Sequence, residues 1–149
     1  MSAAASYRRH IGIIDATGKR HKIDSYVSLE KGVVGDLMVA TYMFGATGVG
    51  ILFPDSAMDQ FNAHKPWSIV PGEPDPIDGH YVPVIGRNAA GNLLCVTWGR
   101  LHAMTPEFYR KYNDETLAYV SLEPLQTRLI SPEGYDEASL RLALKGLAT

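Results

Sequence analysis

Two neighbouring stretches, Asp78-Gly79-His80-Tyr81-Val82-Pro83-Val84-Ile85-Gly86 and Gly91-Asn92-Leu93-Leu94-Cys95-Val96-Thr97-Trp98-Gly99, predict the centre of this fold. Each is a short apolar run with β-branched residues, and the residues between them include the Asn and Gly that tight turns accommodate. We therefore expect an antiparallel hairpin with strands over residues 81–86 and 92–98. A histidine, His80, would stand at the start of the first strand, and a Trp-Gly pair would close the second.

The segments before the hairpin predict two strands and two helices. Alternation of apolar and polar residues is typical of a half-buried strand, and apolar residues three and four positions apart are typical of a helix. On these grounds we expect a strand over residues 20–29, a helix over 33–45, a strand over 48–53 and a short helix over 56–62.

A long connection, residues 55–77, delivers the chain to His80. It contains several prolines, and Trp67 offers it an apolar anchor. Connections longer than about 12–15 residues in compact domains are usually functional or disordered, and we interpret this one as functional. We therefore expect Trp67, Asp78 and Trp98 to be binding residues around His80.

The segments after the hairpin complete the predicted domain. Thr105-Pro106-Glu107 is a typical helix start, a further strand is expected over residues 116–122, and a terminal helix is expected within 131–149. Residues 1–6 are small and polar, and we expect them to be flexible. The whole chain, residues 1–149, is then one α+β domain: a small twisted antiparallel sheet or half-barrel with helices packed on one side.

The composition argues against several classes of partner. The 149 residues carry 14 basic and 16 acidic side chains, so the formal net charge of −2 favours neither nucleic acid nor an anionic membrane. The longest apolar run is too short to cross a bilayer, and the start lacks the apolar core of a signal peptide. With a single cysteine, Cys95, the chain suits a reducing compartment, and we expect a soluble protein made inside a cell.

No recognised cofactor or metal motif occurs in the sequence. The five histidines are scattered, paired cysteines are missing, and neither a P-loop nor a Gly-x-Ser-x-Gly elbow is present. The glycines Gly48 and Gly50 follow a predicted helix, whereas the dinucleotide fingerprint requires a strand before its glycines and a helix after them. We therefore expect no metal and no cofactor.

The hairpin resembles the C-terminal half of papain-like cysteine peptidases, including their C39-like branch. In that family a histidine opens one strand of a small antiparallel barrel, a glycine ends it, and the next strand leads into Trp-Gly. Those positions match His80, Gly86, Trp98 and Gly99. The resemblance implies a papain-like fold and makes His80 the candidate catalytic residue.

A second resemblance covers most of the chain, from residue 19 to residue 122. Stretches such as Arg20-His21-Lys22-Ile23-Asp24 and Val96-Thr97-Trp98-Gly99-Arg100-Leu101 are similar to uncharacterised proteins of actinobacterial phages and prophages. This resemblance implies a viral protein located in the host cytoplasm or in the virion.

Two departures from the peptidase pattern bear on catalysis. The family's nucleophilic cysteine precedes the histidine in sequence, but residues 1–79 contain no cysteine, and the position of the Asn or Asp that orients the imidazole falls on Val96. By strand alternation Cys95 should point away from the face that carries Val96 and sees His80, and we interpret it as a buried apolar residue. Ser56, Ser68 and Thr97 are the alternative nucleophiles, or the nucleophile comes from another chain or segment.

The leading hypothesis from the sequence is therefore a non-catalytic protein of papain-like fold. It would bind another protein, as a virion component or as an effector directed at a host protein, and self-association into a homo-oligomer is also expected to cover apolar surface. The alternative is a papain-type hydrolase or acyltransferase that uses His80.

Overall fold

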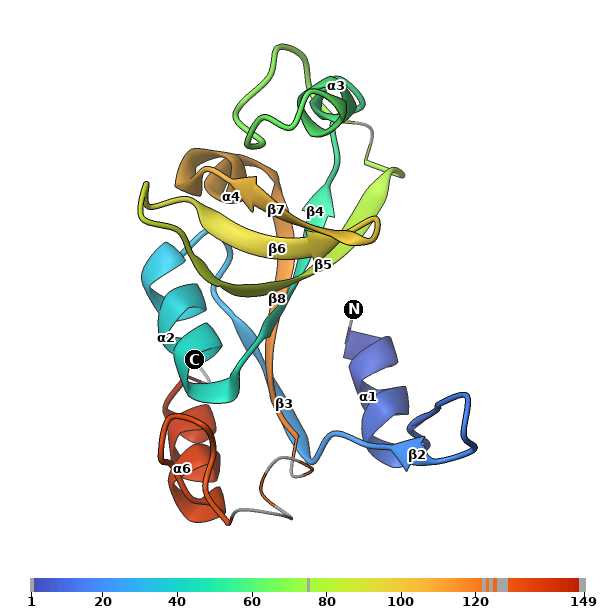
Figure 1. Cartoon of the computed structure of the whole chain (residues 1–149), viewed down its shortest axis with the longest axis vertical. Helices are drawn as coiled ribbons and strands as arrows, with labels where there is room; N and C mark the ends of the chain where they lie inside the picture. The colour runs from blue at the N-terminus through green and yellow to red at the C-terminus, as the bar shows by residue number, and fades with distance from the viewer. Residues whose placement is uncertain (1, 75, 122, 124, 126–128, 148–149) are drawn as a thin grey trace.

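The computed structural model describes residues 2–74, 76–121, 123, 125 and 129–147. Its helices and strands are, in chain order, α1 (Ser2–His10), β1 (Ile13–Ile14), β2 (Arg20–His21), β3 (Ser25–Leu29), α2 (Val34–Phe44), β4 (Thr47–Leu52), α3 (Ala57–Asn62), β5 (Gly79–Arg87), β6 (Leu93–Thr97), β7 (Arg100–Met104), α4 (Pro106–Tyr112), β8 (Asn113–Val120) and α6 (Glu137–Leu147). One sheet has six strands in the order β3-β8-β4-β5-β6-β7, and β1 and β2 form a separate pair (Figure 1). All strand neighbours in both sheets are antiparallel, which is typical of the α+β class.

The predicted hairpin is confirmed as β5 and β6, in which Val84 lies opposite Cys95. The pairing continues into β7, a strand that the sequence analysis did not predict, and Cys95 is there opposite His102. On its other side β5 pairs with β4, which in turn pairs with β8. The sheet is therefore larger than the small sheet we expected, because strands from both halves of the chain join the hairpin.

One face of the sheet carries the main core. Alternation along the strands turns Val49, Ile51, Val82, Val84 and Cys95 toward this face, which we call the covered face, and all five are buried. Helices α2 and α4 contribute to the same core, and α6 packs against β3 and β8 in an adjoining cluster. Figure 1 shows α2 and α6 on the same side of the molecule, one below the other.

The opposite face, which we call the open face, has only α1 near it among the described helices. Ala5 of α1 packs there with Ile23 and with Leu117 of β8. The expectation that the helices pack on one side is therefore wrong for α1, although it holds for α2, α4 and α6. Residues 2–6, which we expected to be flexible, form the first part of this helix.

Two turns position the elements that matter for the site. Trp98 and Gly99, with φ angles of 41° and 76°, are the two residues between β6 and β7. Positive φ at both central positions is characteristic of the type I′ turn, which matches the twist of a hairpin. At the far end of β7, the Thr105 side chain accepts a hydrogen bond from the backbone N–H of Phe108 at 3.1 Å and caps α4, as predicted.

The remaining predicted elements differ mainly at their ends. The strand expected over residues 20–29 is interrupted between β2 and β3, where Ile23 turns into the small cluster beneath α1. The predicted helices correspond to α2, α3, α4 and α6, and the strand expected over 116–122 is β8. The last position of that strand, Leu122, and residues 148–149 of the expected terminal segment lie outside the described residues.

Candidate binding site around His80 and Trp98

His80 enters the site from the start of β5. Its side chain is on the same side of the strand as Val82 and Val84, so it extends the covered face toward the end of the sheet. The imidazole Nε2 lies 2.6 Å from Thr97 Oγ1 at the end of β6, a hydrogen bond between two side chains 17 residues apart. Thr97 is buried, and this bond gives its hydroxyl a partner.

Trp98 lies beside His80 because of the turn that follows Thr97. Its indole stacks on the imidazole with ring centroids 4.3 Å apart and an interplanar angle of 11°. The positive φ of Trp98 is unusual for a bulky residue, and such conformations persist only where the surroundings impose them. The stack and the two-residue turn impose it here, and they leave the indole 47% exposed.

Other aromatic rings surround this pair. Phe53, just beyond β4, meets both His80 and Trp98 edge to face at 5.6 Å, and Phe61 of α3 meets Trp98 edge to face at 4.7 Å. Burial among these rings lowers the pKa of His80 below its ordinary value, because the charged imidazolium loses hydration. His80 is therefore neutral near pH 7.

A basic group borders the aromatic rings. The Arg100 guanidinium lies 3.5 Å from the centroid of the Phe61 ring, donates to the Phe61 carbonyl, and donates from Nη1 to His64 Nδ1 at 3.0 Å. Because His64 Nδ1 accepts this bond, a neutral His64 carries its proton on Nε2. His64, Pro66 and Arg100 line a pocket of about 250 Å³ along β7, and Leu101 and Ala103 also line it.

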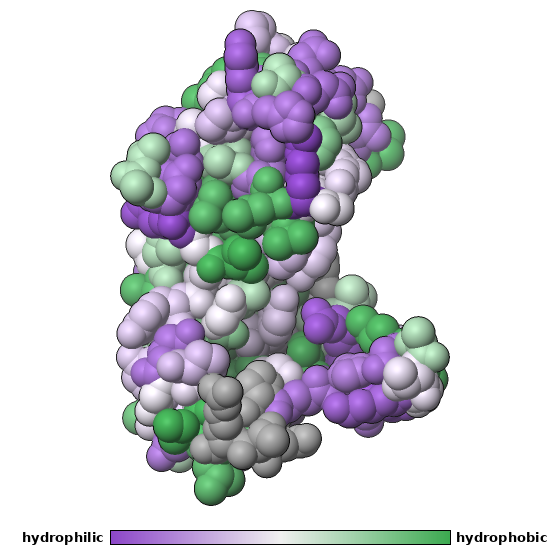
Figure 2. Space-filling model, in the orientation of Figure 1, coloured by the Kyte–Doolittle hydropathy of each residue, from purple (hydrophilic) through white to green (hydrophobic). Residues whose placement is uncertain are grey.

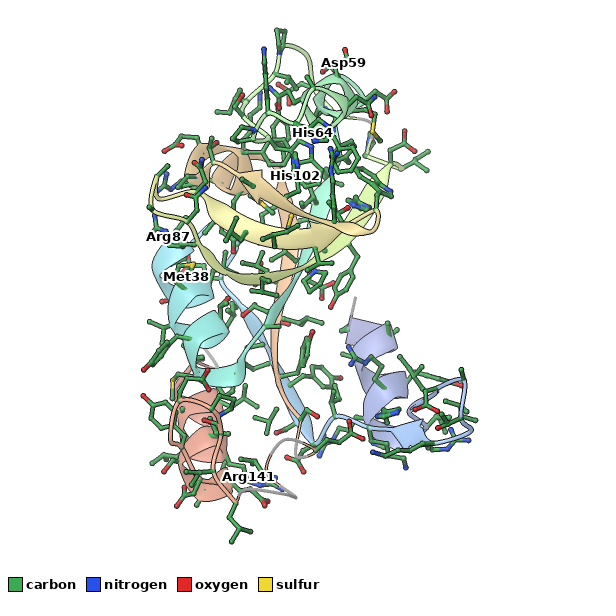
Figure 3. The ribbon with its side chains drawn as sticks, viewed as in Figure 1. Met38, Asp59, His64, Arg87, His102 and Arg141 are labelled. Carbon is green, nitrogen blue, oxygen red and sulfur yellow. The ribbon has the colours of Figure 1, made fainter. Side chains whose placement is uncertain are left out.

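His102 and Trp67 lie beneath this group. Both are buried, their ring centroids are 4.6 Å apart, and neither Trp67 Nε1 nor His102 Nε2 has a hydrogen-bond partner within the part of the chain that the structure describes. Burial, followed by the charges of Arg100 and His64, lowers the pKa of His102 to about 4. Figure 3 shows His64 and His102 at the same end of the molecule, near α3.

The residues expected to surround His80 are brought together only in part. Trp98 stacks on His80, and Trp67 lies 6.2 Å away from His80, centroid to centroid. Trp67, however, is completely buried, so its side chain packs the core and presents no surface to a partner. Asp78 is exposed, and it contributes its backbone carbonyl, which accepts a hydrogen bond from the Phe53 N–H at 2.9 Å.

One prediction about the hairpin is wrong. We expected Cys95 to point away from the face that sees His80, with Val96 on that face. The structure puts His80, Cys95 and Thr97 on the covered face and leaves Val96 exposed on the open face, because His80 follows the inward side of β5. Cys95 is nevertheless inert, since burial raises the pKa of its thiol to about 12 and little thiolate forms at neutral pH.

The three alternative nucleophiles differ in whether they form a hydrogen bond to His80. Ser56 precedes α3, and the Ser68 hydroxyl accepts a hydrogen bond from Gln60 at 2.8 Å. Neither forms a hydrogen bond to His80 in the described chain, whereas Thr97 does. Within the described ranges no group of three or more His, Cys, Asp or Glu side chains is arranged to hold a metal ion.

The open face beside this site carries a contiguous apolar surface. Tyr81 and Ile85 of β5, Val96 of β6 and Leu101 of β7 all point toward it and are each about half exposed. Figure 2 shows a green area over these strands, where the aliphatic members of this surface lie. Sequence reasoning missed both this surface and the basic group, because neither forms a motif and the strand β7 that joins them was not predicted.

Comparisons with known proteins add no relative to this picture. The chain matches no protein-family model, no curated protein and no solved structure. Among the described helices, none has the length and apolar character needed to cross a membrane.

Proposed function

We propose that this chain is a non-catalytic domain that binds another protein through Trp98, Arg100 and the apolar surface of β5, β6 and β7. The observation that carries the proposal is Trp98, a half-exposed indole held in a left-handed conformation by its stack on His80. Tryptophan and arginine are enriched among the residues that dominate binding energy at protein interfaces. A rigid aromatic side chain also loses little conformational entropy when it is buried by a partner.

The adjoining open face supplies the rest of such an interface. Leu101 and Val96 pair directly across β6 and β7, and Ile85 extends the same surface on β5. Exposed apolar groups that lie together in this way are typical of surfaces that a partner covers. Arg100 lies at the border of this surface, where a polar rim is usual in protein interfaces.

The state of His80 supports a non-catalytic role. A general base needs an accessible nucleophile and, in the triad arrangement, a third group that orients the imidazole. The hydroxyl that His80 reaches belongs to Thr97, which is only 5% exposed, and no carboxylate bonds to His80 within the described residues. The pair therefore holds the end of the hairpin together and fixes the position of Trp98.

The proposal includes a papain-like ancestry and a phage or prophage source. His80, Gly86 and the Trp98-Gly99 pair support the ancestry through their resemblance to the peptidase hairpin. On this proposal the partner is a virion protein or a protein of the host, and a second copy of the chain is the remaining candidate.

A matched pair of leucine variants tests the interface. Leu101→Asp introduces a charge into the open face, whereas Leu142→Asp introduces the same charge at an exposed position on α6, outside that surface. We expect Leu101→Asp to abolish capture of a specific partner from an actinobacterial host lysate, or to convert a self-associated wild type to monomer in sedimentation. Leu142→Asp should behave as wild type. Equal behaviour of the two variants would contradict this interface.

The hydrogen bond between His80 and Thr97 favours one alternative, a threonine-dependent acyl hydrolase. At 2.6 Å the two side chains have the spacing of a nucleophile and its base. A fluorophosphonate probe distinguishes the alternatives. Covalent labelling of the wild type that disappears in both His80→Ala and Thr97→Val would replace the non-catalytic proposal, and we expect no such labelling.

A further inference from the structure

A second cavity lies between α1 and the open face, away from the His80 site. Its volume is about 340 Å³, within the range of small-molecule sites. Ala4 and Ala5 of α1, Ile13, Ile23 and Leu117 of β8 form its apolar walls. Figure 2 shows the molecule deeply notched between the main body and the arm that contains α1.

Small residues create this space. Gly48 of β4 lies on the open face, and the Tyr81 side chain lies so close above it that an added Cβ would overlap the Tyr81 hydroxyl and ring. Tyr81 can therefore lie across β4 and form a wall of the cavity. On the opposite wall, Ala4 and Ala5 present only methyl groups from α1, so the helix does not fill the gap.

Polar groups are confined to three side chains in the cavity wall. Tyr81 and Tyr119 both line it, and the Arg8 guanidinium carbon lies 5.1 Å from the centroid of the Tyr119 ring. Burial and the neighbouring Tyr119, whose side chain hydrogen-bonds to Tyr81, raise the pKa of Tyr81, so its hydroxyl remains protonated. Because the two phenols share one hydrogen bond, one O–H of the pair remains to donate to a ligand.

Arg8 is the charged residue among those that line this cavity. Arg8 forms no ion pair with any described carboxylate, and the cavity lining includes no acidic residue. A guanidinium and phenol hydroxyls are donors that suit a carboxylate, and hydrogen bonds between charged groups are roughly twice as strong as neutral ones. A ligand of this cavity also needs an apolar body, because the remaining walls offer only alkyl groups.

We propose that this cavity binds a small amphiphilic carboxylate, such as a medium-chain fatty acid. The alkyl body lies against Ala4, Ile23 and Leu117, and the carboxylate accepts hydrogen bonds from Arg8 and from one hydroxyl of the Tyr81–Tyr119 pair. Tyr81 of β5 borders both this cavity and the open-face surface. The other lining residues belong to α1, β1, β8 and the segment before β3, and the cavity does not use Trp98 or Arg100.

Calorimetric titration with decanoate, decanol and decyltrimethylammonium, each below its micelle concentration, tests the proposal. We expect decanoate to bind one per chain, decanol to bind at least about tenfold more weakly because it lacks the charge, and the cation not to bind. Failure of decanoate to bind, or equal binding of decanoate and decanol, would overturn it. Dimerisation of the ligand-free chain, if it were reversed by decanoate, would also overturn the proposal, because a second copy of the chain would then be the natural occupant of the cavity.

Variants locate the site. Arg8→Gln should weaken decanoate binding by about tenfold, whereas Arg9→Gln, one residue along the same helix and outside the cavity lining, should leave it unchanged. Ala4→Leu should abolish binding by filling the cavity, and its circular dichroism should match that of the wild type, because Ala4 is exposed. If Arg9→Gln weakened binding as much as Arg8→Gln, the attraction would be only the general charge of α1.

Discussion

Acidification is expected to destabilise this protein through one residue of the site, His102. The side chain is only 6% exposed and packs against Trp67 at 4.6 Å and Phe61 at 5.0 Å, centroid to centroid. Burial and the nearby charges of Arg100 and His64 lower its pKa to about 4, so the folded protein holds His102 neutral at pH 7. The unfolded chain takes up the proton much more readily.

The size and pH range of the effect follow from this difference. Between the unfolded pKa of 6.5 and the folded pKa of about 4, the unfolded state binds more protons. The contribution of His102 is therefore fully present above pH 6.5, is lost as the pH falls, and levels off below about pH 4. At about 1.4 kcal/mol for each unit of pKa, the full change in the free energy of unfolding is about 3 kcal/mol.

Urea unfolding at a series of pH values, followed by circular dichroism, measures the effect. His80 also has a lowered pKa and His21 a raised one, so other histidines add to the curve or oppose it. A His102→Leu variant removes only the His102 contribution, and we expect its stability to fall by about 3 kcal/mol less than that of the wild type between pH 7 and pH 4. Parallel curves for the two proteins would refute the reasoning.

Three further predictions concern single residues. Trp67→Phe should lower the free energy of unfolding by no more than about 1 kcal/mol, because loss of a buried N–H without a partner offsets part of the cost of the cavity that the smaller ring leaves. Trp67→Ala should lower it by about 4 kcal/mol. A urea midpoint for Trp67→Phe as low as that for Trp67→Ala would show that the indole N–H is satisfied. Cys95, completely buried and with a raised pKa, should react with a thiol reagent only in urea, and rapid labelling of the native protein would contradict its position. Gly99→Ala should cost about 1–2 kcal/mol because of its φ of 76°. Gly35→Ala in the first turn of α2, where the added methyl meets no atom, should stabilise by about 0.5 kcal/mol in the same thermal unfolding assay.

Local patterns predicted the elements whose signals are contained within a few residues. The hairpin of β5 and β6, the helix α2 that ends at Gly45 and the Thr105 cap of α4 all depend on turn and capping chemistry. The strand β7 was missed because it begins with Arg100 and contains His102 at its centre, so its sequence shows no run of apolar residues. Its identity as a strand is determined by pairing with β6 across the Trp98-Gly99 turn.

Only part of the candidate site, the pair His80 and Trp98, could be predicted from the sequence. His80 and Trp98 were singled out by their resemblance to a known hairpin, and they do stack on one another. His64 and Arg100 could not have been connected, because they are 36 residues apart and meet only when α3 folds over the end of β7. The face of Cys95 was assigned wrongly because alternation shows which residues of a strand share a side and does not show which side sees His80.

The sequence by itself determined the α+β class, the hairpin and most helix boundaries, since these follow from side-chain periodicity and from the backbone preferences of Gly, Pro and Thr. Only the tertiary structure decided that Thr97, rather than Cys95 or Val96, is the partner of His80, and that α1 forms a wall of a cavity opposite Tyr81, which lies over Gly48. Both features join segments distant in the chain. Such contacts depend on strand order and register, which are set by the packing of the whole sheet and leave no trace in any short stretch of residues.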